Sequence, residues 1–420
     1  MSGTTLTGTA IGIDALAFAG PAHYLEMTDL AVARGVDPAK YLQGLGQRRM
    51  AIVTPCEDTV TMAAEAAQHA LDRFAIDPAE IGTLIVGTET GIDHSKPVAV
   101  YVHELLGLPE NCRTFETKHA CYGAMAGLTA SLDWIAAGRA RGRKALVIAS
   151  DIARYGLNTP GEPTQGAGAV AMVIAARPRL VEIDCERTGD YTRQVMDFWR
   201  PLYSKYAFAD GHYSIACYLD ALEAAWRDAA NGDPAALGPA ALAACLYHVP
   251  FVKMAKKAHQ RHLEAARGAP LDLHNEADLQ SLEESYRNKS APYLELNAEI
   301  GNIYTGSLFL ALIDLLRHGQ SALEEQPISL FSYGSGCGAT FALGRIAPGA
   351  TAHAAALDPA ADLAARICLT IAEYESLMNI GDRTDDAEAL DPAAFGLSGG
   401  LYYTGTRDHM RQYRAIRNCL

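Results

Sequence analysis

The sequence predicts an α/β fold, and three observations support this fold class. Apolar runs with the length of buried strands alternate along the chain with amphipathic stretches of helical period. The chain has 420 residues, of which 49% are hydrophobic, enough for one large or two medium-sized cores. An order of strands, polar residues and helices found in the first half also recurs in the second half.

The elements follow from these patterns in chain order. Runs rich in Val, Ile, Leu and Ala predict buried strands at 83–87, 144–149, 169–175, 243–247, 328–332 and 339–343. Apolar residues spaced three or four apart predict helices at 63–73, 98–106, 126–137, 218–228, 253–265 and 307–317. Two segments are expected to be loops or insertions: 184–212, rich in aromatic and charged residues, and 348–400, rich in Ala and Asp.

Charge and cysteine usage exclude several functional classes. The net charge of −14 argues against nucleic acid as a partner. Nine scattered cysteines without a C-x-x-C pair favour a reducing compartment and argue against disulfides or structural zinc. No secretory signal is visible in residues 1–10, and the apolar run 167–176 is too short to span a bilayer. We therefore expect a cytoplasmic protein without a membrane segment or a metal site.

The internal repeat predicts that four polar residues share one site. In the first half, strand 83–87 leads to Glu89, and Cys121 stands at the start of a helix. In the second half, strand 243–247 leads to His248, and Asn302 precedes a helix. Two more strands follow in each half. Two such halves packed about a pseudo-twofold axis would bring the four residues together, so we divide the chain into halves 1–176 and 177–420.

Cys121 is the candidate nucleophile. It ends a polar run, has small neighbours and directly precedes the helical pattern at 126–137. Backbone N–H groups at a helix start favour the thiolate, and small neighbours let an acyl carbonyl approach the backbone. A buried free cysteine is more often inert, so this position alone leaves both interpretations open.

The motifs around these residues resemble the 3-hydroxy-3-methylglutaryl-CoA (HMG-CoA) synthase family of the thiolase-like superfamily. Each motif is ordinary alone, but the whole set in this order is highly specific. The matching segments are 44–47, 118–123, 153–156, 163–170, 197–201, 248–251, 301–307 and 331–336. The resemblance implies a thiolase-like five-layered αβαβα fold of duplicated halves and a homodimer. Segment 348–400 matches poorly, and its role stays open.

The resemblance also implies chemical roles for five residues. Cys121 would accept an acetyl group from acetyl-CoA, which divides the condensation into two steps. Glu89 would be the general base that takes a methyl proton, although without the resemblance a loop or capping carboxylate is the better interpretation of Glu89. His248 would orient and polarise acetoacetyl-CoA. Asn302 would contact its thioester oxygen, and Ser335 would lie near the carboxyl end of the product.

Further residues are expected to hold the CoA moiety. Lys253 and Lys257 lie four apart, on one face of the predicted helix 253–265, where they could clamp the CoA phosphates or simply form a solvated basic stripe. By resemblance, the family's other CoA contacts map to Asp37, Pro38, Lys40, Thr164 and Ser214. No metal or redox cofactor is required, since CoA thioesters are the substrates.

The expected reaction joins acetyl-CoA, acetoacetyl-CoA and water to give HMG-CoA and CoA, a step toward mevalonate and isoprenoids. Two alternatives remain. A polyketide β-branching synthase of the same superfamily would condense acyl groups bound to a carrier protein. A non-catalytic thiolase-fold protein would only bind acyl-CoA, and the presence of Cys121, Glu89 and His248 argues against it.

Overall fold

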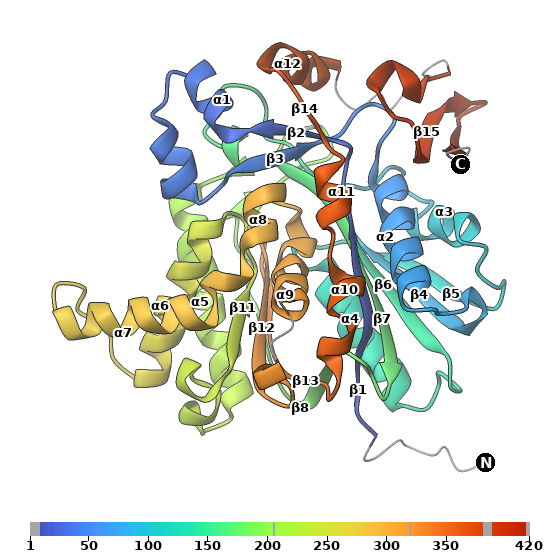
Figure 1. Cartoon of the computed structure of the whole chain (residues 1–420). Coiled ribbons are helices and arrows are strands. Elements are labelled where there is room, and N and C mark those ends of the chain that lie inside the picture. The colour runs from blue at the N-terminus through green and yellow to red at the C-terminus, as the bar shows by residue number, and fades with distance from the viewer. Residues whose placement is uncertain (1–8, 205, 319–320, 381–388, 417–420) are drawn as a thin grey trace.

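The computed structural model describes residues 9–204, 206–318, 321–380 and 389–416. Over these residues the core is a nine-stranded mixed sheet in the order β11-β12-β13-β8-β1-β7-β6-β4-β5 (Figure 1). All the strands predicted from the sequence lie in it. The strands are β1 (Ile11–Ala19), β4 (Ile81–Gly87), β5 (Arg113–Thr117), β6 (Lys144–Ala153), β7 (Gly166–Ala176), β8 (Val181–Thr192), β11 (Ala244–Tyr247), β12 (Pro327–Gly334) and β13 (Gly338–Ile346).

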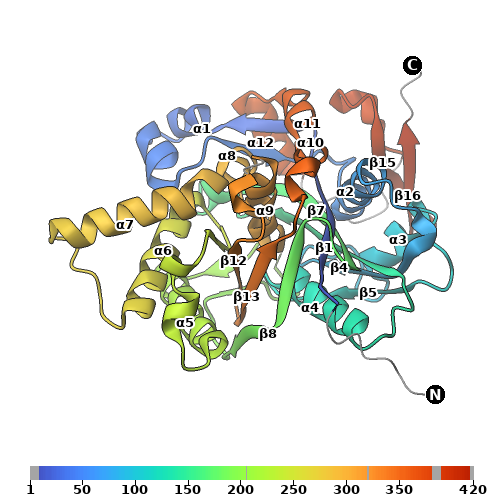
Figure 2. The same cartoon turned by 60° about the horizontal axis from the view of Figure 1, so that its bottom comes forward.

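Helices cover the outer faces of the sheet and fill the space between its two halves (Figures 1 and 2). On one outer side α2 (Thr59–Arg73) and α3 (Val98–Leu105) pack against β1 and β4 to β7. On the other side α5 (Gly211–Ala230) and α6 (Val252–Arg267) pack near β8 and β11 to β13. Helices α4 (Gly123–Ala136) and α9 (Ser307–Arg317) lie between the half-sheets. The thiolase-like αβαβα fold predicted from the sequence is confirmed.

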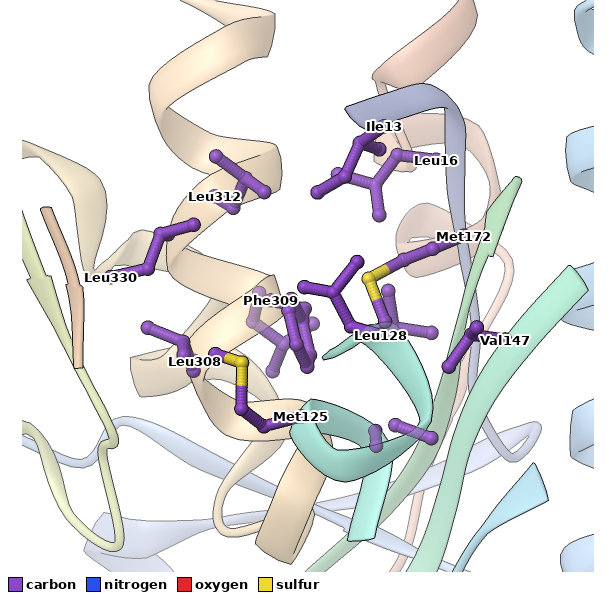
Figure 3. Close-up of a cluster of buried hydrophobic side chains, with 14 of the residues drawn as sticks. Ile13, Leu16, Met125, Leu128, Val147, Met172, Leu308, Phe309, Leu312 and Leu330 are labelled. Atoms are coloured by element: carbon purple, nitrogen blue, oxygen red, sulfur yellow. The ribbon is translucent and has the colours of Figure 1, made fainter. Parts of the chain in front are cut away.

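The two central helices share one hydrophobic core with both half-sheets. Residues 307–316 of α9 are all buried, which explains why this helix is apolar on nearly every side. Figure 3 shows how side chains of the helices meet those of the strands: Met125 and Leu128 of α4, Leu308, Phe309 and Leu312 of α9, and Ile13, Leu16, Val147, Met172 and Leu330 of the sheet.

The sheet topology repeats the pattern seen in the sequence. Strand β4 pairs with β6 in parallel, and β6 then pairs with β7 antiparallel. In the same way β11 pairs with β12 in parallel, and β12 pairs with β13 antiparallel. Strand β8 joins the two halves, since it pairs with β13 and, through two residue pairs, with β1. The division into domains at residues 176 and 177 stays a prediction.

The start of α4 lies very close to the end of β4. A Cβ on Gly87 would stand 2.3 Å from the amide nitrogen of Ala124, and one on Gly123 would stand 2.7 Å from the carbonyl oxygen of Thr117. Any side chain at these two positions would therefore push the strand and the helix apart. This close approach brings the residues that follow β4 next to those that precede α4.

The expected loop at 184–212 is partly wrong. Its first nine residues belong to β8, a central strand of the sheet. Polar and charged residues at 184–188, where the register with β13 shifts, conceal the alternation that marks a strand. The rest forms a short hairpin of β9 (Phe198–Trp199) and β10 (Phe208–Ala209) before α5 begins.

The second expected loop, 348–400, also contains regular structure, and residues 381–388 within it lie outside the described part. It contributes α10 (Ala354–Leu357), α11 (Ala360–Ala364), β14 (Ile367–Cys368) and α12 (Ile371–Ile380). Strand β14 completes a small sheet with β2 (His23–Glu26) and β3 (Arg49–Ile52). The sequence analysis also missed α1 (Met27–Ala33), α7 (Glu276–Lys289), α8 (Glu295–Ile300) and the hairpin of β15 (Gly400–Arg407) and β16 (Met410–Ile416). None of the described helices combines the length and the hydropathy that a bilayer crossing requires.

Candidate active site

A cavity of about 600 Å³ lies where the two halves of the molecule meet. Six of the predicted site residues line it, and they come from both halves of the chain: Cys121, Thr164, Ser214, His248, Asn302 and Ser335. A larger cavity of about 730 Å³ lies between α2 and the β15–β16 hairpin, and none of the predicted site residues lines it. The smaller cavity is therefore the candidate active site.

Cys121 stands in the tight connection between β5 and α4. Its φ of +57° lies in the left-handed region, and its side chain is 8% exposed. Burial, followed by the charges of Glu89 and Asp151, raises the pKa of the thiol well above its ordinary value. Burial and these negative charges therefore outweigh the effect of the helix start, and the Cys121 thiol is protonated before substrate binds. The thiol must pass its proton to a base when it attacks.

Glu89 is next to this thiol. Its Oε1 lies 3.7 Å from Sγ of Cys121, which donates to it, and 3.1 Å from the Cys121 amide nitrogen. Burial, then the charge of Asp151, raises the pKa of Glu89, while Arg200 opposes the rise. A carboxyl with a raised pKa is a stronger base once ionised, as proton removal from a carbon acid requires.

Asp151, at the end of β6, holds the backbone that carries Glu89. Its Oδ1 accepts hydrogen bonds from the amide nitrogens of Glu89 (2.9 Å) and Thr90 (3.1 Å) and from the hydroxyls of Thr88 and Thr90. Its Oδ2 is buried without a hydrogen-bond partner. Burial raises the pKa of Asp151 as well, although these hydrogen bonds oppose the rise. Arg200 donates to the carbonyl oxygen of Glu89 from the other side.

His248 enters the cavity from the end of β11. Its amide nitrogen donates to Phe331 (2.7 Å), and its carbonyl oxygen accepts from the Tyr218 hydroxyl (2.8 Å). The side chain is 2% exposed, and burial lowers its pKa to about 3. The imidazole is therefore neutral and has one N–H to donate. Its Nδ1 has no protein partner, so a substrate oxygen or donor can meet this ring.

Asn302 lies in a turn that connects the two halves. Gly301 forms a bridge with Gly166 of β7, and a Cβ on Gly301 would stand 2.0 Å from the Gln165 carbonyl oxygen. The side-chain Oδ1 of Asn302 accepts from the amide nitrogen of Tyr304 (2.8 Å) and the hydroxyl of Ser307 (3.2 Å). Since the oxygen is committed to this turn, the NH₂ group is the part that remains for a substrate.

Ser335 lines the cavity beside a buried carboxylate that the sequence analysis did not single out as a site residue. Asp197 is fully buried and accepts from the Tyr333 hydroxyl (2.7 Å), the Gly336 amide nitrogen (2.9 Å) and the Ser214 hydroxyl (3.3 Å). These contacts tie the loop around Ser335 to α5. The role of Ser335 toward a product stays a prediction.

The residues expected to hold CoA divide into two groups. Thr164 and Ser214 line the cavity, as described above. Lys253 and Lys257 do not line it; they lie on the exposed face of α6, whose Met254 does. Asp37, Pro38 and Lys40 also lie outside, next to the short helix η1 (Lys40–Leu45). Because η1 packs against α6, Lys40 lies on an element next to the one that carries Lys253 and Lys257. The contact of these three lysines with CoA stays a prediction.

Comparison with known proteins agrees with this geometry. Residues 7–178 match the hydroxymethylglutaryl-coenzyme A synthase N-terminal domain, and residues 181–266 and 271–415 match the C-terminal domain of the same enzymes. The chain belongs to the HMG-CoA synthase family. The resemblance stated from the sequence is thereby confirmed.

Individual relatives show how similar this HMG-CoA synthase family member is to proteins of known name. It is 40% identical to the hydroxymethylglutaryl-CoA synthase of Enterococcus faecalis, over 91% of this chain and 94% of that one. A structure described as MvaS in complex with 3-hydroxy-3-methylglutaryl coenzyme A is 47% identical, covers 97% of this chain and 99% of its own, and has a TM-score of 0.89. The polyketide biosynthesis 3-hydroxy-3-methylglutaryl-ACP synthase PksG of Bacillus subtilis is 34% identical, over 87% of both chains.

Four residues of this HMG-CoA synthase family site, Asp151, Asp197, Arg200 and Tyr304, were not singled out from the sequence. Asp151 could have been found, because a carboxylate that interrupts the apolar run of β6 next to the parallel strand β4 must lie beside Glu89. Asp197 and Arg200 stood in the motif 197–201 without an assigned role, and Arg200 reaches Glu89 from the β9–β10 hairpin. Tyr304 stood in the motif 301–307 but carried no assigned role.

Proposed function

We propose that this protein condenses acetyl-CoA with acetoacetyl-CoA and water to give HMG-CoA and free CoA. The observation that carries the proposal is that Cys121 and His248 line one cavity, while the Glu89 carboxylate lies 3.7 Å from Sγ of Cys121. The family relationship supports the same reaction.

In the first step Cys121 Sγ attacks the thioester carbonyl of acetyl-CoA. The S–H proton goes to the Glu89 carboxylate, which already accepts a hydrogen bond from this thiol, and then to the departing CoA sulfur. The product is acetyl-Cys121 and free CoA. Glu89 ends the step ionised and ready for the next proton.

In the second step Glu89 removes a proton from the acetyl methyl group, and the resulting carbon nucleophile attacks the ketone carbon of acetoacetyl-CoA. The ketone oxygen becomes an alkoxide, which the N–H of neutral His248 stabilises by a hydrogen bond. The proton that Glu89 removed from the methyl group is returned to this oxygen, which leaves Glu89 ionised. The NH₂ group of Asn302 holds the thioester oxygen of the acceptor. Water then hydrolyses the Cys121 thioester, which gives the carboxylate of HMG-CoA and restores the thiol.

Free CoA is the favoured carrier rather than a carrier protein. Its 3′-phosphate and pyrophosphate need cations, and the exposed side chains of Lys40, Lys253 and Lys257 on adjoining elements can provide them. The 40% and 47% identity to two CoA-named relatives, against 34% to the ACP synthase, supports the same carrier. A role in mevalonate formation and a cytoplasmic location belong to this proposal.

A homodimer is also part of the proposal. Strand β5 forms one end of the nine-stranded sheet and has a neighbour on one side only, β4, among the described strands. An open edge of this kind can pair with the same edge of a second copy about a twofold axis. Sedimentation of the intact protein would show twice the chain mass if the proposal is correct.

Mass spectrometry tests the reaction directly. Protein mixed with acetyl-CoA alone should gain one acetyl group on the peptide that contains Cys121, and addition of acetoacetyl-CoA should then release HMG-CoA. Cys121→Ser should do neither. Acetylation of another residue, or faster turnover with acetoacetyl carrier protein than with acetoacetyl-CoA, would contradict the proposal.

A further inference from the structure

Tyr304 has a buried hydroxyl group that no protein group satisfies. The side chain is 1% exposed and lines the cavity with Cys121 and Asn302. Its Oη is one of the few buried side-chain atoms without a hydrogen-bond partner in the described part of the chain. The Tyr155 phenol is close enough to influence it, but the two hydroxyls do not have hydrogen-bond geometry.

The backbone holds Tyr304 in this place at a conformational cost. Its φ is +47°, in the left-handed region, which a bulky residue rarely adopts. The hydrogen bond from its amide nitrogen to the Asn302 side chain stabilises the turn. The ring is fixed by edge contacts with Phe198 and Tyr155, with ring centroids 6.1 Å and 6.5 Å away. Strained residues of this kind concentrate at functional sites.

The duplicated fold relates Tyr304 to Cys121. Cys121 stands just before central helix α4 with a φ of +57°, and Tyr304 stands just before central helix α9 with a φ of +47°. The two residues belong to one small buried cluster with Ala153. The second half therefore places a phenol where the first half places the nucleophile, and both face the same cavity.

The Tyr304 hydroxyl can act only as a hydrogen-bond donor of constant strength here. Burial, together with the charges of Tyr155 and Glu89, raises its pKa well above the ordinary value, so it stays protonated at every working pH. A buried hydrogen-bond donor without a partner is costly to the folded state. An acyl oxygen on Cys121 would remove that cost.

We propose that Tyr304 is a further catalytic residue, whose hydroxyl donates a hydrogen bond to the carbonyl oxygen of the acetyl group on Cys121. This inference rests on the proposed function. When Glu89 takes the methyl proton, the C–H electron pair forms the new C=C bond, and the C=O π pair moves onto this oxygen. Tyr304 stabilises the resulting enolate oxygen and keeps its own proton. The C=O bond re-forms as the methylene carbon attacks the acceptor ketone.

Other donors do not already fill this role. The Cys121 amide nitrogen donates to Glu89 Oε1, and the Asn302 NH₂ group is assigned to the thioester oxygen of the acceptor. His248 enters from β11 of the second half and is assigned to the acceptor ketone. A donor aimed where negative charge develops is worth most in the enolate, so its loss should slow proton removal more than acetylation.

The test is Tyr304→Phe, compared with the wild type and with Tyr403→Phe. Tyr403 is a buried tyrosine remote from the cavity whose hydroxyl bonds to Thr406, so it controls for loss of a buried hydroxyl. Protein acetylated by acetyl-CoA is mixed with acetoacetyl-CoA, and a single turnover of HMG-CoA formation is followed. We expect Tyr304→Phe to acetylate fully but to condense about a hundredfold more slowly. A trideuterated acetyl group should slow the variant by a larger factor than it slows the wild type, since proton removal becomes rate-limiting.

A spectroscopic measurement separates a catalytic from a structural role. The infrared band of a ¹³C-labelled acetyl carbonyl on Cys121 should move to higher wavenumber in Tyr304→Phe, because one hydrogen bond is lost. An unchanged band and unchanged condensation would overturn the role of Tyr304, and equal losses of acetylation and condensation would do the same. If the wild type fails to acetylate Cys121 at all, the proposed function itself fails.

Discussion

The carboxylate of Glu89 contacts Cys121 twice, since its Oε1 lies 3.1 Å from the amide nitrogen and 3.7 Å from Sγ. One side chain can thus serve both the thiol and the acyl group that later replaces the thiol proton. The two halves of the reaction place unequal demands on it, because a thiol is far more acidic than a thioester methyl group.

Glu89→Gln should therefore separate the two steps. We expect Cys121 to be acetylated still, more slowly than in the wild type, while condensation falls by about a hundredfold or more, the usual contribution of a general base. Mass spectrometry of the acetylated peptide and HMG-CoA formation from preloaded enzyme measure the two steps. An equal decline in both would make Glu89 a structural residue.

Asp151→Asn should move the pH dependence of condensation. Glu89 acts as a base only when ionised, and burial and the Asp151 charge raise its pKa, so the wild-type rate rises with pH through that raised pKa. Asparagine can still accept the hydrogen bonds to Oδ1 but carries no charge, so the pKa of Glu89 falls and the acid limb moves to lower pH. Single-turnover rates across pH measure this.

A matched control for this profile is Asp314→Asn. Asp314 is fully buried, with a pKa raised to about 6 by burial, but it bonds to Leu296 and Arg317 rather than to site residues. Its variant should keep the wild-type profile. An acid limb that moves upward in Asp151→Asn, or moves equally in both variants, would contradict the electrostatic coupling.

Lys253→Ala and Lys257→Ala should weaken CoA binding. Both side chains are exposed, so we expect a rise of about tenfold in KM for acetoacetyl-CoA, equivalent to ~1.4 kcal/mol, with a smaller change in kcat. Lys256 lies on the same helix but pairs with Glu283, so Lys256→Ala should leave KM unchanged. Steady-state kinetics measure these KM values. Equal KM values for all three variants would contradict the binding of the CoA phosphates by Lys253 and Lys257.

Tyr247→Phe should destabilise the fold. Its hydroxyl lies 3.1 Å from Nδ1 of His259 and 3.0 Å from Nδ1 of His262, both buried. His262 Nε2 must donate to the Leu237 carbonyl oxygen, so its Nδ1 accepts from Tyr247, and His259 Nδ1 then donates to Tyr247. Losing the hydroxyl leaves His262 Nδ1 buried without a partner, whereas His259 Nδ1 keeps Ser290 Oγ at 3.2 Å, and this should cost about 2 kcal/mol. Tyr304→Phe, which removes an unpaired hydroxyl, should cost nothing in the same urea titration.

Six strands of the sheet and the two central helices could be predicted because burial on both sides makes their sequences apolar, although β1, which is equally buried, was missed. Strand β8 could not, because charged residues occupy its irregular register with β13. Small neighbours and a following helix made Cys121 a candidate, but its assignment, like those of Glu89 and His248, needed the repeat and the resemblance. Asp151 could have been found from the parallel pairing of β6 with β4, whereas Arg200 reaches Glu89 through a contact across the fold. A hydroxyl without a partner, such as that of Tyr304, leaves no trace in a sequence.

The joint between the half-sheets limits how this molecule can move. Strand β8 continues the sheet from β13 to β1, while the two central helices lie packed between the halves (Figure 2). A hinge motion that separated Cys121 from His248 would have to break the pairing of β8 with β13 or with β1. We therefore expect the catalytic groups to keep their spacing through the cycle, so that substrates and products exchange through the rim of the cavity, where the β9–β10 hairpin lies.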